Sequence, residues 1–281
     1  MEEQNQNEDL NQDSPTGLDY YRQNHKWQHE IGISKKDVEL AEKEQETDDE
    51  RILDLVLIMD ITSSMGPFID LAKNTFKQAI EDTLINYPEL DVRVAVVGYR
   101  DFCDKEIFYI HDFTFDLDKI KSKISRIQPK GGGDIPEDVQ GAFRMGLELQ
   151  WRKNSIKLAY FIADAPCHGS EYHTCTDSRR EGNPAGLVLE DIIREYSDRE
   201  IDVSCYKLTN KTEIMFKVMQ TSFDEGKHKG DFQFIDLRRE VTAAKKKKNG
   251  LRSDVMVESY SRNHRSDFSS RLSKHSIRRG W

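Results

Sequence analysis

One short stretch of the chain places three oxygen-bearing side chains at alternate positions. Asp60, Thr62 and Ser64 follow an apolar run directly, in the sequence LVLIMDITSSM. Alternate residues of an extended segment point to the same side, so these three side chains can converge. Carboxylate and hydroxyl oxygens are the ligands that hard divalent cations such as Mg²⁺ take. We therefore expect this stretch to contribute ligands to a metal ion.

Two further carboxylates stand where they could join the same ion. Asp134 follows three glycines, and Asp164 ends the apolar run IKLAYFIAD. A buried carboxylate without a partner is costly, and a cation would remove that cost. The predicted ion is Mg²⁺ or Mn²⁺, and its predicted ligands are Asp60, Thr62, Ser64, Asp134 and Asp164.

Each part of this pattern also has a purely structural explanation. A hydroxyl of residues 62–64 could cap a helix that begins near Pro67. Asp134 and Glu137 have the spacing of a capping box, and Asp164 precedes Ala-Pro and could belong to a turn. We favour the metal site because all the parts occur together and in a consistent order.

The elements that must position these residues alternate along the chain. Short runs too apolar to face water predict buried strands at 52–60, 92–100, 156–164 and 201–208. Amphipathic helices are expected between them, with an antiparallel edge strand at 107–113 and a last strand at 231–237. This predicts a Rossmann-like three-layer α/β/α sandwich around a mostly parallel six-stranded sheet. Ligands of such sheets bind beyond the carboxyl ends of the strands.

Charge is distributed unevenly over the 281 residues. Residues 1–50 hold 15 acidic and 5 basic side chains, whereas residues 241–281 hold 11 basic and 3 acidic ones. We expect an acidic, disordered arm at 1–50, one domain at 51–237 and a basic tail at 238–281. Tyr20, Tyr21 and Trp27 are unusual in a disordered arm and could dock on some surface, which the sequence does not specify.

Several classes of protein are disfavoured by the sequence. No apolar run follows Met1, and no stretch approaches the ~18–20 apolar residues that a membrane-spanning helix needs. The four cysteines are expected to be reduced thiols of an intracellular protein. The predicted location is the cytoplasm, with cytoskeletal association as one option.

The order and spacing of the motifs resemble the von Willebrand factor type A domain with its metal-ion-dependent adhesion site, over about residues 51–237. The stretches VVGYRDFCD, GGGDIPEDVQGAF, IADAPCHGSEYH and NPAGL are similar to the type A domains that accompany atypical alpha-kinases. The resemblance implies metal ligation by Asp60, Thr62, Ser64 and Asp164. Asp134 stands where the adhesion pattern has Thr, and a third carboxylate would weaken the attraction of the ion for an acidic partner residue. Nothing after residue 237 is expected to form a kinase catalytic domain.

Two other groups of residues could take part in chemistry. A zinc site is one reading of the cluster Cys167, His168, His173 and Cys175. Its spacing is not that of a standard zinc finger, so hydrogen-bonded histidines and packed thiols are the favoured reading. Asp101 and Asp104 are expected in a turn, where they could line the rim of the metal face.

The leading functional hypothesis is a non-enzymatic module for protein–protein interaction. Its metal face and the loop 165–186 would contact a partner protein, and the basic tail would dock on an acidic partner. One alternative is a structural subunit of a large assembly, for example a cytoskeletal one, anchored by its tails. Another is a Mg²⁺-dependent hydrolase, although the sequence has no phosphate-binding Gly-rich loop with Lys. Nucleic acid and small-molecule substrates are disfavoured.

Overall fold

The structure is a computed structural model that describes residues 18–24, 28–30, 52–227 and 230–239. Its strands are β1 (Gln28–Glu30), β2 (Ile52–Asp60), β3 (Asp91–Tyr99), β4 (Phe108–Thr114), β5 (Ile156–Ala163), β6 (Ile201–Lys207) and β7 (Phe232–Asp236). Its helices are α1 (Leu18–Asn24), α3 (Ile69–Asn86), α4 (Leu117–Arg126), α5 (Val139–Leu147), α6 (Leu189–Asp198) and α7 (Glu213–Asp224), with a 3-10 turn η1 (Ser63–Met65).

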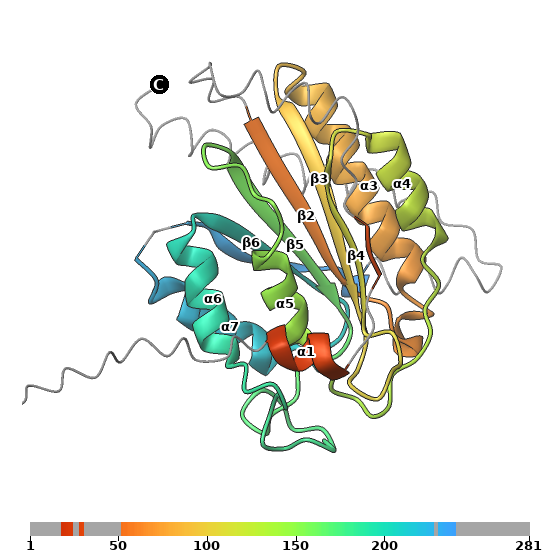
Figure 1. Cartoon of the computed structure of the whole chain (residues 1–281), viewed down its shortest axis with the longest axis vertical. Coiled ribbons are helices and arrows are strands. Elements are labelled where there is room, and N and C mark those ends of the chain that lie inside the picture. Colours follow the sequence, from red (N-terminus) through yellow and green to blue (C-terminus); the bar gives the residue numbers. More distant parts are fainter. Residues whose placement is uncertain (1–17, 25–27, 31–51, 228–229, 240–281) are drawn as a thin grey trace, which may run out of the picture.

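The strands form one sheet in the order β1-β4-β3-β2-β5-β6-β7 (Figure 1). All neighbouring pairs are parallel except β3 and β4, which are antiparallel. The six strands predicted from the sequence are β2 to β7, and the antiparallel one is β4 as expected. The sheet is therefore the mostly parallel sheet of a Rossmann-like α/β fold.

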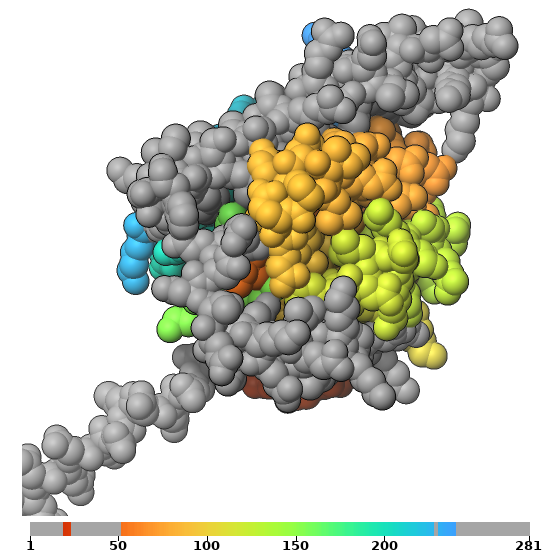
Figure 2. All heavy atoms as spheres, turned by 90° about the horizontal axis from the view of Figure 1, so that it is seen from above, coloured from red at the N-terminus to blue at the C-terminus, as the bar shows by residue number. Residues whose placement is uncertain are grey.

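Helices cover both faces of the sheet, which explains the continuous apolar runs (Figure 1). Every residue of β2 is buried, and its side chains alternate between the two faces. Leu55 and Leu57 belong to a core with α3 and α4, whereas Val56 and Ile58 belong to a core with α5, α6 and α7. Figure 2 shows α3 in orange and α4 in yellow-green side by side on one flank.

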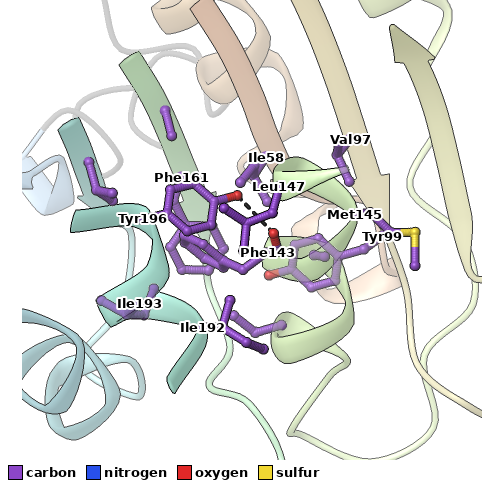
Figure 3. Packing of buried hydrophobic residues seen from close by; sticks show 14 of the residues in the cluster. Ile58, Val97, Tyr99, Phe143, Met145, Leu147, Phe161, Ile192, Ile193 and Tyr196 are labelled. Atoms are coloured by element: carbon purple, nitrogen blue, oxygen red, sulfur yellow. Dashed lines mark hydrogen bonds between the residues drawn. The ribbon is translucent and has the colours of Figure 1, made fainter. Parts of the chain in front are cut away.

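Aromatic side chains fill the core between the sheet and α5 and α6 (Figure 3). The ring of Phe143 on α5 meets Phe161 of β5 and Tyr196 of α6 edge to face, with centroids 4.8 and 5.2 Å apart. The hydroxyl of Tyr196 donates a 2.8 Å hydrogen bond to the backbone oxygen of Phe143. This packing fixes α5, whose first residues border the carboxyl edge of the sheet.

The structure adds two elements in the region predicted as a disordered arm. Strand β1 pairs in parallel with β4 and makes a seventh strand, so β4 is not the outermost strand. A seventh strand supplies hydrogen-bond partners that the outer edge of β4 would lack. Helix α1 inserts Tyr21 into the core with no exposed surface. Trp27, the rest of the arm and the tail from 240 lie outside the described residues.

Length and hydropathy also bear on membrane insertion. Among the helices of the described ranges, none combines the length and the apolar character needed to cross a bilayer.

Candidate metal centre at the carboxyl edge of the sheet

The last residue of β2 presents a carboxylate at the carboxyl edge of the sheet. Asp60 is fully buried, and its Oδ1 accepts hydrogen bonds from the Thr62 amide at 2.8 Å and the Thr62 hydroxyl at 2.7 Å. Its other oxygen, Oδ2, is buried and has no hydrogen-bond partner. Asp60 therefore has one anchored oxygen and one oxygen open to a ligand.

A chain of hydroxyls joins Asp60 to the end of the neighbouring strand β5. The hydroxyls of Thr62 and Ser64 lie 3.2 Å apart, and the Ser64 hydroxyl donates a 2.7 Å bond to Oδ1 of Asp164. Asp164 follows β5 directly, and its backbone oxygen accepts a bond from the Thr209 hydroxyl. The structure thus brings four of the five predicted ligands into one hydrogen-bonded group, the Asp60–Asp164 cluster.

Burial makes both carboxylates of the Asp60–Asp164 cluster hard to ionise without a cation. Loss of solvent, together with the charge of Asp164, raises the pKa of Asp60 to about 7. Burial also raises the pKa of Asp164, against the hydrogen bond from Ser64. Two hydroxyls and two carboxylates, one of which has an unpartnered buried oxygen, match the oxygen donors that Mg²⁺ or Mn²⁺ takes, so the residues fit the predicted ion.

A third buried carboxylate, Glu137, borders the Asp60–Asp164 cluster and was not among the predicted ligands. Glu137 is 2 % exposed, and its Oε2 has no hydrogen-bond partner. Burial and the charges of Asp60 and Asp101 raise its pKa to about 10. Its other oxygen, Oε1, lies 3.0 Å from where a Cβ on Gly132 would stand. The capping-box explanation of Glu137 fails, because α5 is capped by Asp138, whose Oδ1 accepts from the Gly141 amide.

The fifth predicted ligand, Asp134, lies with a different set of side chains. Ligand atoms of Asp134, Asp101 and His168 all lie within 4.8 Å of one another. Oδ2 of Asp134 accepts a 2.5 Å bond from the Ser178 amide, and Oδ1 is buried without a partner. The sequence placed Asp101 at the rim of the metal face, and in the structure Asp101 belongs to this second group.

Two carboxylates hold the ring of His168, which has no exposed side-chain surface. Nδ1 lies 2.7 Å from Oδ1 of Asp177, and Nε2 lies 2.9 Å from Oδ1 of Asp101. Burial alone would lower the pKa of His168, but the hydrogen bonds to Asp101 and Asp177 outweigh it and raise that pKa. Although burial acts the other way, the Gly169 amide and the His168 ring lower the pKa of Asp177 to about 2.

The cysteines of the loop do not converge on these histidines. Cys167 is fully buried, and its amide donates to the sulfur of Met215. The Cys175 amide donates to Nδ1 of His173, whose Nε2 lies 3.2 Å from Asp177. Among the described residues, the candidate metal group contains neither cysteine. The histidines are hydrogen-bonded, as the favoured reading of the sequence had it.

Comparison with known proteins shows what the central part of the chain resembles. Residues 54–178 match the family profile of the von Willebrand factor A domain. This part of the chain is therefore similar to a von Willebrand factor A domain. The pilus adhesin SpaC of Lactobacillus rhamnosus GG, in its open conformation, aligns with 72% of this chain and 30% of its own, at a TM-score of 0.46 and 14% identity.

Two curated proteins are similar over part of their length. The alpha-protein kinase vwkA of Dictyostelium discoideum is 35% identical over 145 residues, which is 51% of this chain and 23% of the kinase. A putative ariadne-like RING finger protein of Acanthamoeba polyphaga mimivirus is 29% identical over 121 residues, which is 43% of this chain and 12% of that protein. The matches span less than a quarter of either relative.

Proposed function

We propose that the chain is a non-enzymatic protein–protein interaction module that binds its partner at the carboxyl edge of the sheet through a divalent cation. The observation that carries this proposal is the Asp60–Asp164 cluster with its unpartnered oxygen on Asp60. The ion is Mg²⁺ or Mn²⁺, and the residues that would hold it are Asp60, Thr62, Ser64, Asp164 and the bordering Glu137. The bound ion would supply an electrophilic position for an oxygen atom of the partner.

The charge of the cluster limits what the partner offers. Asp60 and Asp164 together already neutralise a divalent ion once both are ionised. The ion therefore attracts an acidic side chain of the partner less than it would with two hydroxyls and one carboxylate. The partner's contribution is a carbonyl or hydroxyl oxygen, with the loop 165–186 adding contacts around it.

The thiols give no support to catalysis. Burial and the neighbouring Asp101 raise the pKa of Cys103 to about 12, and burial raises the pKa of Cys167 as well. Thiols with raised pKa values are poor nucleophiles at neutral pH. This argues against a thiol nucleophile at the carboxyl edge of the sheet.

The proposal is tested by recovering partner proteins from native extract, with the metal removed in one comparison and the metal site mutated in another. The full chain and the Asp60→Asn variant are immobilised, and bound proteins are quantified with Mg²⁺ and with EDTA. The Asp118→Asn variant, at an exposed carboxylate on α4, is the matched control. We expect the same partners to be lost with EDTA and with Asp60→Asn, but not with Asp118→Asn. Equal recovery by the full chain and by Asp60→Asn, with Mg²⁺ and with EDTA alike, would contradict the proposal. Mg²⁺-dependent hydrolysis of esters or phosphates that Asp60→Asn abolishes would also contradict it.

The predicted role of the basic tail remains separate from this site. Residues 240–281 lie outside the described part of the chain, so docking of the tail on an acidic partner remains a proposal from sequence alone. The same recovery experiment on a chain truncated after Leu237 tests it.

A further inference from the structure

We propose a second cation site beside the Asp60–Asp164 cluster, formed by Asp101, Asp134 and His168 and suited to Zn²⁺. The three residues come from three separate segments: the turn after β3, the glycine-rich segment before α5 and the loop after β5. Their ligand atoms lie within 4.8 Å of one another, a spread that a single ion can span with modest movement. The proposal is independent of whether the Asp60–Asp164 cluster binds a partner.

One acid of this site has an oxygen that no described protein donor satisfies. Oδ1 of Asp134 is buried without a hydrogen-bond partner. Both oxygens of Asp101 accept hydrogen bonds, Oδ1 from the Phe102 amide and Oδ2 from the Cys103 thiol. Buried polar atoms are normally paired, and an unpaired carboxylate oxygen beside a second acid and an imidazole fits a bound cation.

The chemistry of the ligands favours Zn²⁺ over Mg²⁺ here. An imidazole nitrogen suits Zn²⁺, whereas Mg²⁺ prefers the all-oxygen set of the Asp60–Asp164 cluster. The nitrogen facing the site is Nε2 of His168, while Nδ1 lies 2.7 Å from Asp177. A carboxylate on the far nitrogen is the usual support of a histidine ligand, because it fixes the tautomer and the ring orientation.

Asp177 is itself held firmly enough to orient the histidine. It accepts hydrogen bonds from the backbone amides of Gly169 at 2.9 Å and Arg179 at 2.7 Å. The side chain of Asp177 is only 1 % exposed. The chain thus supplies both the ligands and the group that supports one of them.

The metal-free and Zn²⁺-bound forms of this site differ in the protonation of His168, and this difference can be measured. Without an ion, His168 would carry protons on both nitrogens and donate to Asp101 and Asp177 together. With Zn²⁺, the proton on Nε2 is released to solvent and the nitrogen binds the metal, while Nδ1 keeps its proton. The ¹⁵N shifts of the ring report which state is present.

The test is titration of the full chain with Co²⁺, followed by absorption, and displacement of Co²⁺ with Zn²⁺. We expect Asp134→Asn and His168→Gln each to weaken Zn²⁺ binding by at least about tenfold. His173→Gln, which changes a neighbouring histidine that also contacts Asp177, and Asp118→Asn serve as matched controls and are expected to change it less than about threefold. Because the chain has eight histidines, the assignment rests on these comparisons and not on stoichiometry.

The outcomes separate this site from the proposed Mg²⁺ site. Asp60→Asn should lose Mn²⁺ binding, measured by calorimetry, and keep the Co²⁺ spectrum that His168→Gln loses. Should His168→Gln fail to fold, Asp134→Asn decides, because Asp134 is partly exposed and the substitution is isosteric. Unchanged Zn²⁺ affinity in Asp134→Asn, or ¹⁵N shifts of His168 that stay those of an imidazolium in saturating Zn²⁺, would overturn the proposal.

Discussion

The hydroxyl of Tyr21 donates a 3.0 Å hydrogen bond to Oδ1 of Asp138, across 117 residues of sequence. The side-chain nitrogen Nδ2 of Asn183 donates to both of these oxygens, also at 3.0 Å. Asp138 caps α5 and directly follows Glu137, which borders the Asp60–Asp164 cluster. The N-terminal segment therefore supports the wall of the candidate metal centre.

Removal of the Tyr21 ring should destabilise the whole domain. The ring is fully buried and packs against Phe102 and Phe108, with centroids 6.3 and 5.1 Å away. Tyr21→Ala should lower the free energy of unfolding by roughly 3–5 kcal/mol, as for other buried aromatics. Tyr21→Phe keeps the ring and loses the hydroxyl, so a loss of about 1–2 kcal/mol is expected. Urea denaturation measures both, and a Tyr21→Ala variant as stable as wild type would show that α1 does not dock.

The charge of Asp60 should make the stability of the metal-free domain fall with rising pH. The pKa of Asp60 is about 7 in the folded protein and 3.8 as its ordinary value, so the folded state binds more protons between these values. Stability is then highest near pH 4 and decreases as pH rises to 7. At about 1.4 kcal/mol per pKa unit, the full effect is at most about 4 kcal/mol.

The Asp60→Asn variant tests both this pH dependence and the stabilisation of the domain by a bound metal ion. Without metal, the variant should be more stable than wild type at pH 8 and similar near pH 4. Saturating Mn²⁺ should stabilise wild type, by about 2.7 kcal/mol at 100 times its Kd, and leave the variant unchanged. Thermal denaturation at the two pH values, with and without Mn²⁺, measures these differences. A variant that gains as much from Mn²⁺ as wild type would place the ion elsewhere.

The parts of the structure that sequence predicted are those that local pattern determines. Strand β2 follows from its apolar run, and Asp60, Thr62 and Ser64 follow from their alternate positions at its end. Asp164 was found because parallel strands present their carboxyl ends at one edge. Tyr21 was not predicted at this edge because its partner Asp138 is 117 residues away in the sequence. Glu137 was not predicted there because its position depends on the conformation of the preceding glycine-rich loop.

The position of Asp134 also could not be predicted from local sequence pattern. It follows Gly131 and Gly132, whose φ angles of +80° and +85° turn the chain in a way that residue types alone do not specify. The turn places Asp134 beside Asp101 and His168, and leaves Glu137 beside Asp60. A count of residues from Asp60 could not have distinguished these two carboxylates.

Gly132→Ala should affect the metal centre as well as stability. A Cβ on Gly132 would lie 3.0 Å from Oε1 of Glu137 and 3.2 Å from Cβ of Thr62, at a φ that disfavours side chains. The variant should lose about 1–3 kcal/mol of stability and weaken Mn²⁺ binding, because Thr62 or Glu137 must move. Gly182→Ala is the matched control, since Gly182 has a φ of +96° and a Cβ added there would meet no described atom within 4 Å. Equal Mn²⁺ affinity in both variants, by calorimetry, would argue against a role for this contact.

Asp54 should matter for stability but not for the metal, because it lies on β2 six residues before Asp60. Asp54 is fully buried, with Oδ1 bonded to Arg152 at 2.9 Å and Oδ2 to Arg93 at 2.9 Å. Burial opposes its ionisation, but Arg93 and Arg152 outweigh it and hold the pKa of Asp54 below its ordinary value. Asp54→Ala removes the carboxylate that Arg93 and Arg152 share and leaves Arg152 with Asp91 at 3.3 Å, so it should cost about 3–5 kcal/mol.

The pH dependence of this ion pair has the opposite sign to that of Asp60. A carboxylate with a lowered folded-state pKa stabilises the protein above its ordinary pKa, and this contribution is lost as pH falls below about 4. The difference between wild type and Asp54→Ala should therefore be large at pH 7 and shrink towards pH 2. Urea denaturation across this range measures it, and Mn²⁺ calorimetry at pH 7 should give the same Kd for both proteins. A variant that remains folded yet loses Mn²⁺ would mean that the two ends of β2 are coupled and that the Asp60–Asp164 cluster does not hold its ligands independently of the arginines.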